Sequence, residues 1–129
     1  MIVVDSAAVV DALTAVAGTD ELRAHLAAED LHAPSLIDFE VVSALRGLTL
    51  RGHLSATRAE DLLIDFDDLP LQCWPSAHAL RRRAFQLRNN VSAHDAAYVA
   101  LAEALACPLV TRDGRLARSS GHGARIQLR

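Results

Sequence analysis

The sequence predicts an α/β fold, a three-layer sandwich in which helices flank a mainly parallel central sheet. Short apolar runs recur along the chain and are typical of strands buried on both faces. They alternate with longer segments whose apolar residues recur at helical spacing, which is the pattern of α/β proteins. With 129 residues, of which 51% are hydrophobic and 22% charged, the chain has enough apolar material for one core, so we expect a single domain over residues 1–129.

The first half of the chain is expected to form two strands and three helices. Ile2–Val4 is a β-branched run that ends at Asp5 and suits a central strand. The elements expected after it are a helix from Ser6 until Gly18, a helix beginning at Thr19–Glu21, a short strand at Leu31–Ala33, and a long helix from Pro34–Ser35 to about Arg51. Gly52 is the kind of residue that ends a helix.

The second half repeats this alternation. The expected elements are a helix over Ser55–Leu69, a strand at Leu71–Trp74, a helix from Pro75–Ser76 to about Arg88, a strand at Leu109–Thr111, a turn at Arg112–Gly114 and an edge strand within Ala124–Leu128. A further helix begins after Ser92, a good N-cap residue. Only Glu103 is charged between Ala96 and Ala106, so we expect this helix to be buried almost all round.

Composition narrows the classes of function. The net charge of -3 does not suit a protein that coats nucleic acid, and all 13 basic residues are arginine, which excludes mechanisms built on a Schiff-base or P-loop lysine. Cys73 and Cys107 lack metal-ligand spacing and are expected to be buried thiols. Because no apolar stretch approaches membrane-spanning length and the first residues do not resemble a signal peptide, we expect a cytoplasmic protein without membrane contact.

Four acidic residues are candidate site residues because of where they stand. Asp5 follows one expected strand, Asp113 follows another, and Asp95 falls in the first turn of the apolar helix. In a parallel sheet covered by helices, strand ends and helix beginnings meet at one edge, where such proteins bind ligands. Glu40, near the beginning of its helix, is the fourth candidate.

Each of these acids also has a simpler explanation. Asp5 and Asp95 can act as helix caps, and Asp113 as a turn residue. Asp38 competes with Glu40, which we favour because its helix face carries small or apolar neighbours and no basic residue one turn away. If the four candidates converge, their mutual repulsion favours a bound cation, and oxygen ligands without histidine or cysteine favour Mg²⁺ or Mn²⁺ over zinc.

Four stretches of sequence resemble the acidic blocks of PIN domains, in the family's order. They are Val4-Asp5-Ser6, Glu40 followed by Val-Val-Ser-Ala-Leu, His94-Asp95-Ala-Ala-Tyr-Val-Ala-Leu-Ala, and Leu109-Val-Thr-Arg-Asp113. In length and one-domain layout the chain is similar to VapC, the ribonuclease toxin of VapBC toxin-antitoxin pairs, and the resemblance covers nearly the whole chain. Some relatives carry a further acidic residue after the last aspartate, whereas Arg115 and Arg118 occupy that region here, which disfavours a second metal site.

The resemblance implies a PIN-like fold and a Mg²⁺- or Mn²⁺-dependent endoribonuclease that hydrolyses RNA phosphodiester bonds. By analogy, Asp5 and Asp95 would be the principal metal ligands. Asp113 and Glu40 would complete the catalytic acidic pocket, directly or through water. Candidate substrate-binding residues beside the acids are Ser6, Thr111, Arg112 and Arg115, for which structural roles are an equal alternative.

The resemblance also implies partners. They are a cognate VapB-like antitoxin and the RNA substrate, within a homodimer or a toxin-antitoxin hetero-oligomer. Two other classes of function stay open: a binding module of the same fold without physiological nuclease activity, and a receiver-like phosphoryl-transfer protein that uses Asp5. The receiver-like class is disfavoured by the absence of lysine, of an Asp-x-Asp motif at Asp5 and of a phosphate-binding glycine loop.

Overall fold

The computed structural model describes residues 1–129 and has a five-stranded, fully parallel sheet at its centre. Its strands are β1 (Ile2–Val4), β2 (Leu31–Pro34), β3 (Leu71–Trp74), β4 (Leu109–Thr111) and β5 (Ile126–Leu128). They lie in the order β3-β2-β1-β4-β5, so that β1 is the central strand, as its β-branched sequence indicates. The parallel sheet expected from the sequence is confirmed.

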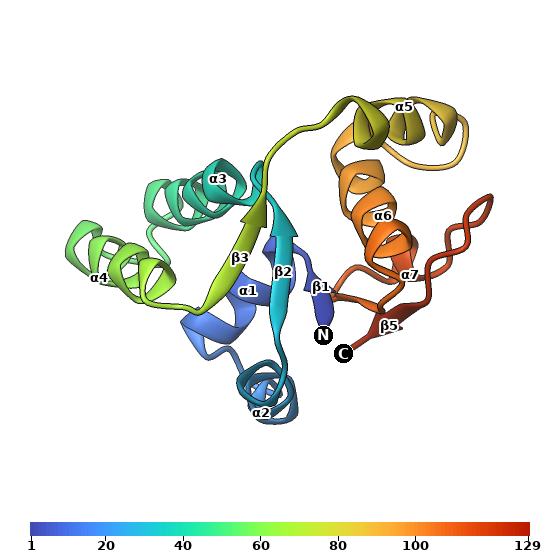
Figure 1. Ribbon diagram of the computed structural model, residues 1–129. Helices are drawn as coiled ribbons and strands as arrows, with labels where there is room; N and C mark the ends of the chain where they lie inside the picture. The colour runs from blue at the N-terminus through green and yellow to red at the C-terminus, as the bar shows by residue number, and fades with distance from the viewer.

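Seven helices cover the sheet. They are α1 (Ser6–Thr14), α2 (Asp20–Ala28), α3 (Ile37–Leu50), α4 (Ala56–Asp67), α5 (His78–Gln86), α6 (Ala93–Leu105) and α7 (Gly114–Ala117). Helices α1, α3 and α4 pack together on one side of the sheet, and α5 and α6 pack together on the other (Figure 1), which confirms the three-layer sandwich. Helix α2 contacts α1, and the short α7 contacts β4 and β5. None of the helices combines the length and the apolar character needed to cross a bilayer.

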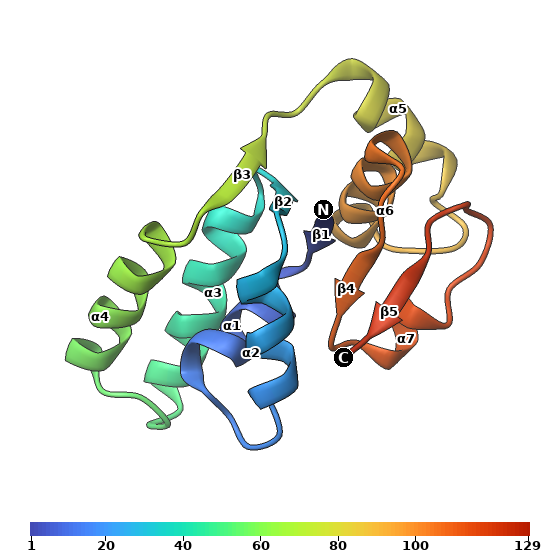
Figure 2. The ribbon, with the colours of Figure 1, turned by 60° about the horizontal axis from the view of Figure 1, so that its bottom comes forward.

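The direction in which strands are added reverses beside β1. The chain first moves outward from β1 to β2 and β3, and it then crosses to the other side of β1 to form β4 and β5 (Figure 2). At such a reversal the connections after the two adjacent strands diverge, and a crevice opens at the carboxyl ends of the strands. The strands here are β1 and β4, which are followed by Asp5 and Asp113. The fold therefore brings these two acids to the place where open α/β sheets bind ligands.

Helix α6 contacts β1, β2 and β4 and contributes much of the core. The Ser92 hydroxyl caps it by accepting a hydrogen bond from the Asp95 N–H at 3.2 Å. Every residue from Tyr98 to Ala102 is buried, so the prediction of burial almost all round holds for the middle of the helix, whereas Ala93, His94 and Ala104 are exposed. Glu103, its one charged residue beyond the first turn, accepts hydrogen bonds of 2.8 and 3.0 Å from Arg83 of α5, which stabilises the pairing of the two helices.

The prediction of a turn over Arg112–Gly114 is wrong at its last residue, because helix α7 begins at Gly114. The Asp113 carboxylate accepts hydrogen bonds from the N–H groups of Arg115 at 2.8 Å and Leu116 at 3.4 Å, and so caps α7. Only Leu116 in this helix is buried. A four-residue helix with one apolar contact has no periodicity that a sequence can reveal.

Two further expectations are corrected. The first helix ends at Thr14 rather than near Gly18, because Ala15 takes the left-handed conformation with φ of 52°. Cys73 is exposed rather than buried, since β3 is an edge strand with a neighbour on one side only, whereas Cys107 is buried as predicted.

We predict that Leu101→Ala lowers the free energy of unfolding by about 3 kcal/mol, because Leu101 is 1% exposed and its truncation leaves a cavity between α6 and the sheet. The matched control Leu50→Ala changes a leucine that is 69% exposed and should alter stability by less than about 1 kcal/mol. Urea denaturation followed by circular dichroism measures both values. Equal losses in the two variants would contradict the assigned core.

Candidate active site

Asp5 is the buried member of the candidate site, with 6% of its surface exposed. It stands at the junction of β1 and α1 and caps the helix, since Oδ1 accepts a hydrogen bond from the Ala8 N–H at 2.9 Å. Oδ2 accepts a hydrogen bond from the hydroxyl of Thr111, the last residue of β4. The carboxylate is therefore fixed between two adjacent strands by groups that the fold supplies.

Burial decides the protonation of Asp5. It raises the pKa of this carboxyl from 3.8 to about 6, against the opposing effect of the hydrogen bonds from Thr111 and Ala8. The negative charges of Asp95 and Asp113 raise the pKa further. The three carboxylates therefore interact electrostatically, although they come from distant parts of the sequence.

Asp95 and Asp113 are both half-buried and both lie at the beginning of a helix. Asp95 is in the first turn of α6, where a negative charge is favoured by the unpaired N–H groups. Asp113 is joined to Asp5 through Thr111, whose Oγ1 accepts the Asp113 N–H at 2.9 Å while its hydroxyl donates to Asp5. Of the three acids predicted to converge with Asp5, two (Asp95 and Asp113) lie close enough to raise its pKa.

Glu40 lies in the first turn of α3 and contacts Tyr98 of α6, the helix that packs on the other side of the sheet. It accepts a hydrogen bond from the Tyr98 hydroxyl, and its Oε2 lies 3.7 Å from Nδ1 of the exposed His94. Burial and the charge of Glu40 raise the pKa of the Tyr98 hydroxyl, which therefore remains a donor. Asp38, the competing acid, is exposed and lies 3.8 Å from the Cys73 sulfur.

Tyr98 is the residue that the sequence analysis missed. It is 2% exposed and interacts with two of the candidate acids. Its hydroxyl donates a hydrogen bond to Glu40, and the charge of Asp5 raises its pKa. A signal was present in the sequence. A tyrosine in an otherwise apolar, buried helix needs a partner for its hydroxyl, and Tyr98 stands three residues after Asp95, on the same helix face.

The candidate substrate-binding residues differ in their availability. Thr111 is fully buried and its hydroxyl is already bonded to Asp5 and Asp113. Ser6 is half-buried. Arg112 is held by Asp11 at 3.0 Å and by the Arg129 carbonyl at 2.9 Å, which leaves little of it for a ligand. Arg115 is exposed and has no carboxylate within salt-bridge distance.

The acids suit a hard divalent cation by their chemistry, but they do not form a finished coordination shell. Asp5, Asp95 and Asp113 offer oxygen donors only, and a cation would relieve the repulsion that raises the pKa of Asp5. No group of three histidine, cysteine, aspartate or glutamate side chains is close enough to hold an ion. The donor chemistry of the acids, rather than a finished geometry, therefore matches an ion such as Mg²⁺, which keeps several bound waters.

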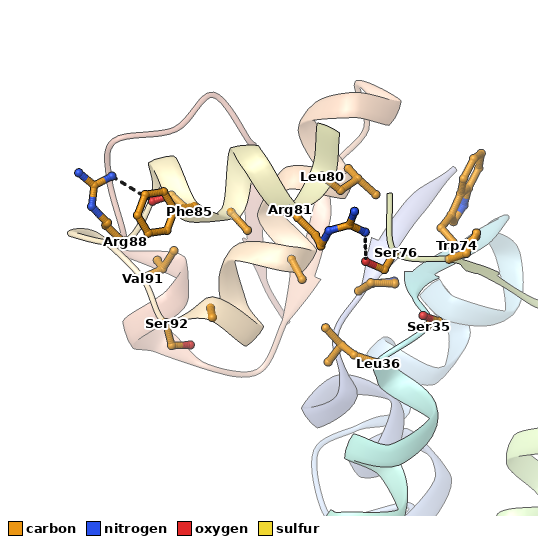
Figure 3. A pocket seen from close by; sticks show the side chains of 15 residues that line it. Ser35, Leu36, Trp74, Ser76, Leu80, Arg81, Phe85, Arg88, Val91 and Ser92 are labelled. Atoms are coloured by element: carbon orange, nitrogen blue, oxygen red, sulfur yellow. Dashed lines mark hydrogen bonds between the residues drawn. The ribbon is translucent and has the colours of Figure 1, made fainter. Parts of the chain in front are cut away.

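A largely apolar hollow lies beside the beginning of α6. It has a volume of about 570 Å³ and is bounded by the beginning of α3, the end of β3, and helices α5 and α6 (Figure 3). Leu36, Trp74, Leu80 and Val91 are among its lining residues, and no acidic residue lines it. Its surface is suited to apolar contact and lacks groups for hydrolysis.

The chain is similar to known proteins over nearly its whole length. The model of the PIN domain family matches residues 2–121. The chain is 43% identical over 129 residues to ribonuclease VapC12 of Mycobacterium tuberculosis, with 99% of this chain and 98% of the relative covered. It is 45% identical over 116 residues to ribonuclease VapC9 of the same organism, with 90% of this chain and 88% of the relative covered.

A solved structure shares the fold at low sequence identity. The toxin-antitoxin complex from Klebsiella pneumoniae contains a chain that superposes with a TM-score of 0.67 at 16% identity, covering 98% of this chain and 96% of that chain. Since the family model spans nearly all of the sequence and the named relatives exceed 40% identity over most of their length, the chain belongs to the PIN domain family and, within it, to the VapC proteins.

Proposed function

We propose that this protein is the toxin of a type II toxin-antitoxin system, a cytoplasmic endoribonuclease that depends on Mg²⁺ or Mn²⁺. The observation that carries the proposal is that Asp5 is buried at the carboxyl end of β1 and has a raised pKa, to which the charges of Asp95 and Asp113 contribute. The ribonuclease names of the relatives support the same activity.

The acids would hold the cation and the attacking water. A bound Mg²⁺ or Mn²⁺ supplies positive charge for the scissile phosphate and for the leaving oxygen. Asp5 and Asp95 are the proposed ligands, and Asp5 is kept in place by Thr111 and Ala8. Asp113 or Glu40 would orient the water and accept its proton, and the bond that Tyr98 donates to Glu40 positions that carboxylate.

The proposed hydrolysis fixes the chemistry of the product ends. Oxygen from water forms a bond to phosphorus while the bond between phosphorus and the 3′ oxygen breaks. One product therefore carries a 5′-phosphate and the other a 3′-hydroxyl. Cleavage by histidine acid-base chemistry would use the 2′-hydroxyl instead and leave a cyclic phosphate.

We predict that Asp5→Asn and Asp95→Asn each lower the rate of RNA cleavage in Mg²⁺ by at least about a hundredfold, because each removes a carboxylate from the proposed cation site. Asp61→Asn, which changes an exposed acid of α4, is the control and should keep the wild-type rate. The measurement is the initial rate on total RNA, with sequencing of the 5′ ends after brief induction in cells. If the purified, antitoxin-free wild type were as inert as the variants, a non-catalytic binding module would be the better reading.

We predict a pH-dependent stability that tests cation binding without activity. In EDTA, the raised pKa of Asp5 means that its contribution to stability is complete below about pH 4 and is lost as the pH rises through about 6, which amounts to roughly 3 kcal/mol. Asp5→Asn removes this loss, so the variant should melt at a higher temperature than the wild type at pH 7.5 and at a similar temperature at pH 4. Adding Mn²⁺ at pH 7.5 should raise the melting temperature of the wild type alone. Equal responses of the two proteins to Mn²⁺ would count against the site.

The proposed partner is a VapB-like antitoxin, in a homodimeric or hetero-oligomeric complex. The Klebsiella pneumoniae neighbour, described as a toxin-antitoxin complex, supports this proposal. The acidic crevice could accept an antitoxin arginine among the carboxylates, since a guanidinium pairs with carboxylate oxygens in a forked geometry.

We predict that the cognate antitoxin suppresses cleavage and binds Asp95→Asn at least about tenfold more weakly than the wild type, because a charged partner of its arginine is lost. Isothermal titration in EDTA measures the affinity, with Asp61→Asn as the control. An unchanged affinity for Asp95→Asn would show that the antitoxin does not use the acids.

A further inference from the structure

A second hollow reaches the candidate site at Asp95 and is lined mainly by basic and polar residues. We call it the arginine cleft; it has a volume of about 710 Å³ and lies between residues 88–92 on one side and residues 115–120 on the other. Its basic residues are Arg88, Arg115 and Arg118, and Asp95 is the one acid in its lining. The cleft therefore shares a residue with the candidate active site while carrying a local excess of positive charge in a chain whose net charge is -3.

The three arginines are not used by the fold as ion-pair partners. The salt bridges of arginine in this protein are those of Arg83 and Arg112, so none involves the cleft. Arg88 lies over the ring of Phe85, 4.6 Å from its centre, and donates to the Phe85 carbonyl at 3.2 Å (Figure 3). Both contacts orient the guanidinium and leave its charge unneutralised, so the cleft presents unpaired cations beside a site for a phosphodiester.

The walls of the cleft are tied to each other and to the core. Gly121, with φ of +85°, lies directly against Asn90, so close that a Cβ atom at this position would be 2.6 Å from the Asn90 side chain. On the same side, Ser119 contacts the Leu116 carbonyl at 2.6 Å and the His122 ring at 2.9 Å, and Leu116 is buried. The Gly121 contact therefore packs one wall against the other, and the Ser119 contacts order the wall formed by residues 115–120.

We propose that the arginine cleft binds the sugar-phosphate backbone of the single-stranded RNA segment that continues from the scissile phosphate past Asp95. The inference rests on the proposed ribonuclease function. An RNA chain whose scissile phosphate lies at the acids must extend beyond Asp95, and the cleft provides cations for its next phosphates together with amide and hydroxyl groups from Asn89, Asn90 and Ser120. These groups contact the backbone or sugar without reading base sequence.

A protein segment is the less suitable occupant. Only two of the residues that line the cleft, Val91 and Leu116, are apolar, whereas stable protein interfaces have an apolar centre. The apolar hollow of Figure 3, on the other side of Arg88 and Ser92, has the lining expected of a protein contact. Arg88 lines both hollows, so the two surfaces meet there.

The test compares two triple variants that remove the same charge. In an Asp5→Asn background that leaves RNA intact, we compare Arg88→Ala/Arg115→Ala/Arg118→Ala with Arg23→Ala/Arg46→Ala/Arg58→Ala, which changes exposed arginines away from the cleft. The probe is a fluorescent single-stranded RNA oligonucleotide, and anisotropy is measured over a series of salt concentrations. The cleft variant should bind at least tenfold more weakly at low salt. Its slope of log affinity against log salt should fall by about 2, which is three contacts at about 0.7 each.

A third variant separates charge from folding. Replacing the same three cleft arginines by lysine keeps the cations and should preserve most of the salt slope, and thermal melting should show all variants folded. The inference is overturned if both alanine variants lose the same affinity, if neither loses any, or if the cleft variant keeps its RNA affinity but loses the antitoxin.

The outcomes distinguish this inference from the proposed function. If the wild-type protein cleaves RNA in Mg²⁺ and the cleft variant in the wild-type background cleaves equally fast at limiting RNA, the cleft inference fails and the nuclease stands. If the wild type cleaves nothing but the cleft variant alone loses RNA binding, the cleft inference stands and the proposed hydrolysis fails.

Discussion

The burial of one carboxylate, that of Asp5, is the constraint on which the rest of the candidate site depends. A charge beneath the first turn of α1 is costly, and the fold compensates with the Ala8 N–H and the Thr111 hydroxyl. Thr111 also accepts the Asp113 N–H, so a continuous chain of hydrogen bonds joins the end of β1 to the start of α7. Even so, the pKa of Asp5 stays above its ordinary value, which means that the folded protein holds an anion it does not fully satisfy.

Charge is distributed unevenly around this carboxylate. The acids lie at the strand ends, and Tyr98, whose pKa is raised by the charge of Asp5, donates a hydrogen bond to Glu40 of α3. Unpaired arginines occupy the adjoining cleft, while Arg83 and Arg112 are neutralised within the fold. A net charge of -3 therefore conceals a cationic surface next to an anionic one, and the local arrangement rather than the total decides where a polyanion can approach.

The sequence was sufficient to predict the parallel sheet, its strands, and the acids that the strand ends bring together, because these depend on local periodicity and on the geometry common to parallel sheets. It was not sufficient where an outcome depends on distant partners. Arg112 pairs with Asp11, far away in the sequence, and Arg88 lines the same cleft as Arg115 only after folding. Helix α7 and the left-handed conformation of Ala15 each involve only a few residues and contacts, so no repeating sequence pattern predicts them.

Asp5 also has an evolutionary consequence, because a single side chain both caps a helix and supplies the buried anion. An amide oxygen can replace the capping carboxylate oxygen, and an aspartate codon becomes an asparagine codon by one base change. The scaffold can thus lose its anion in a single mutational step and keep its architecture. Lineages of this fold are therefore expected to include inactive paralogues that still bind the partners of their active ancestors.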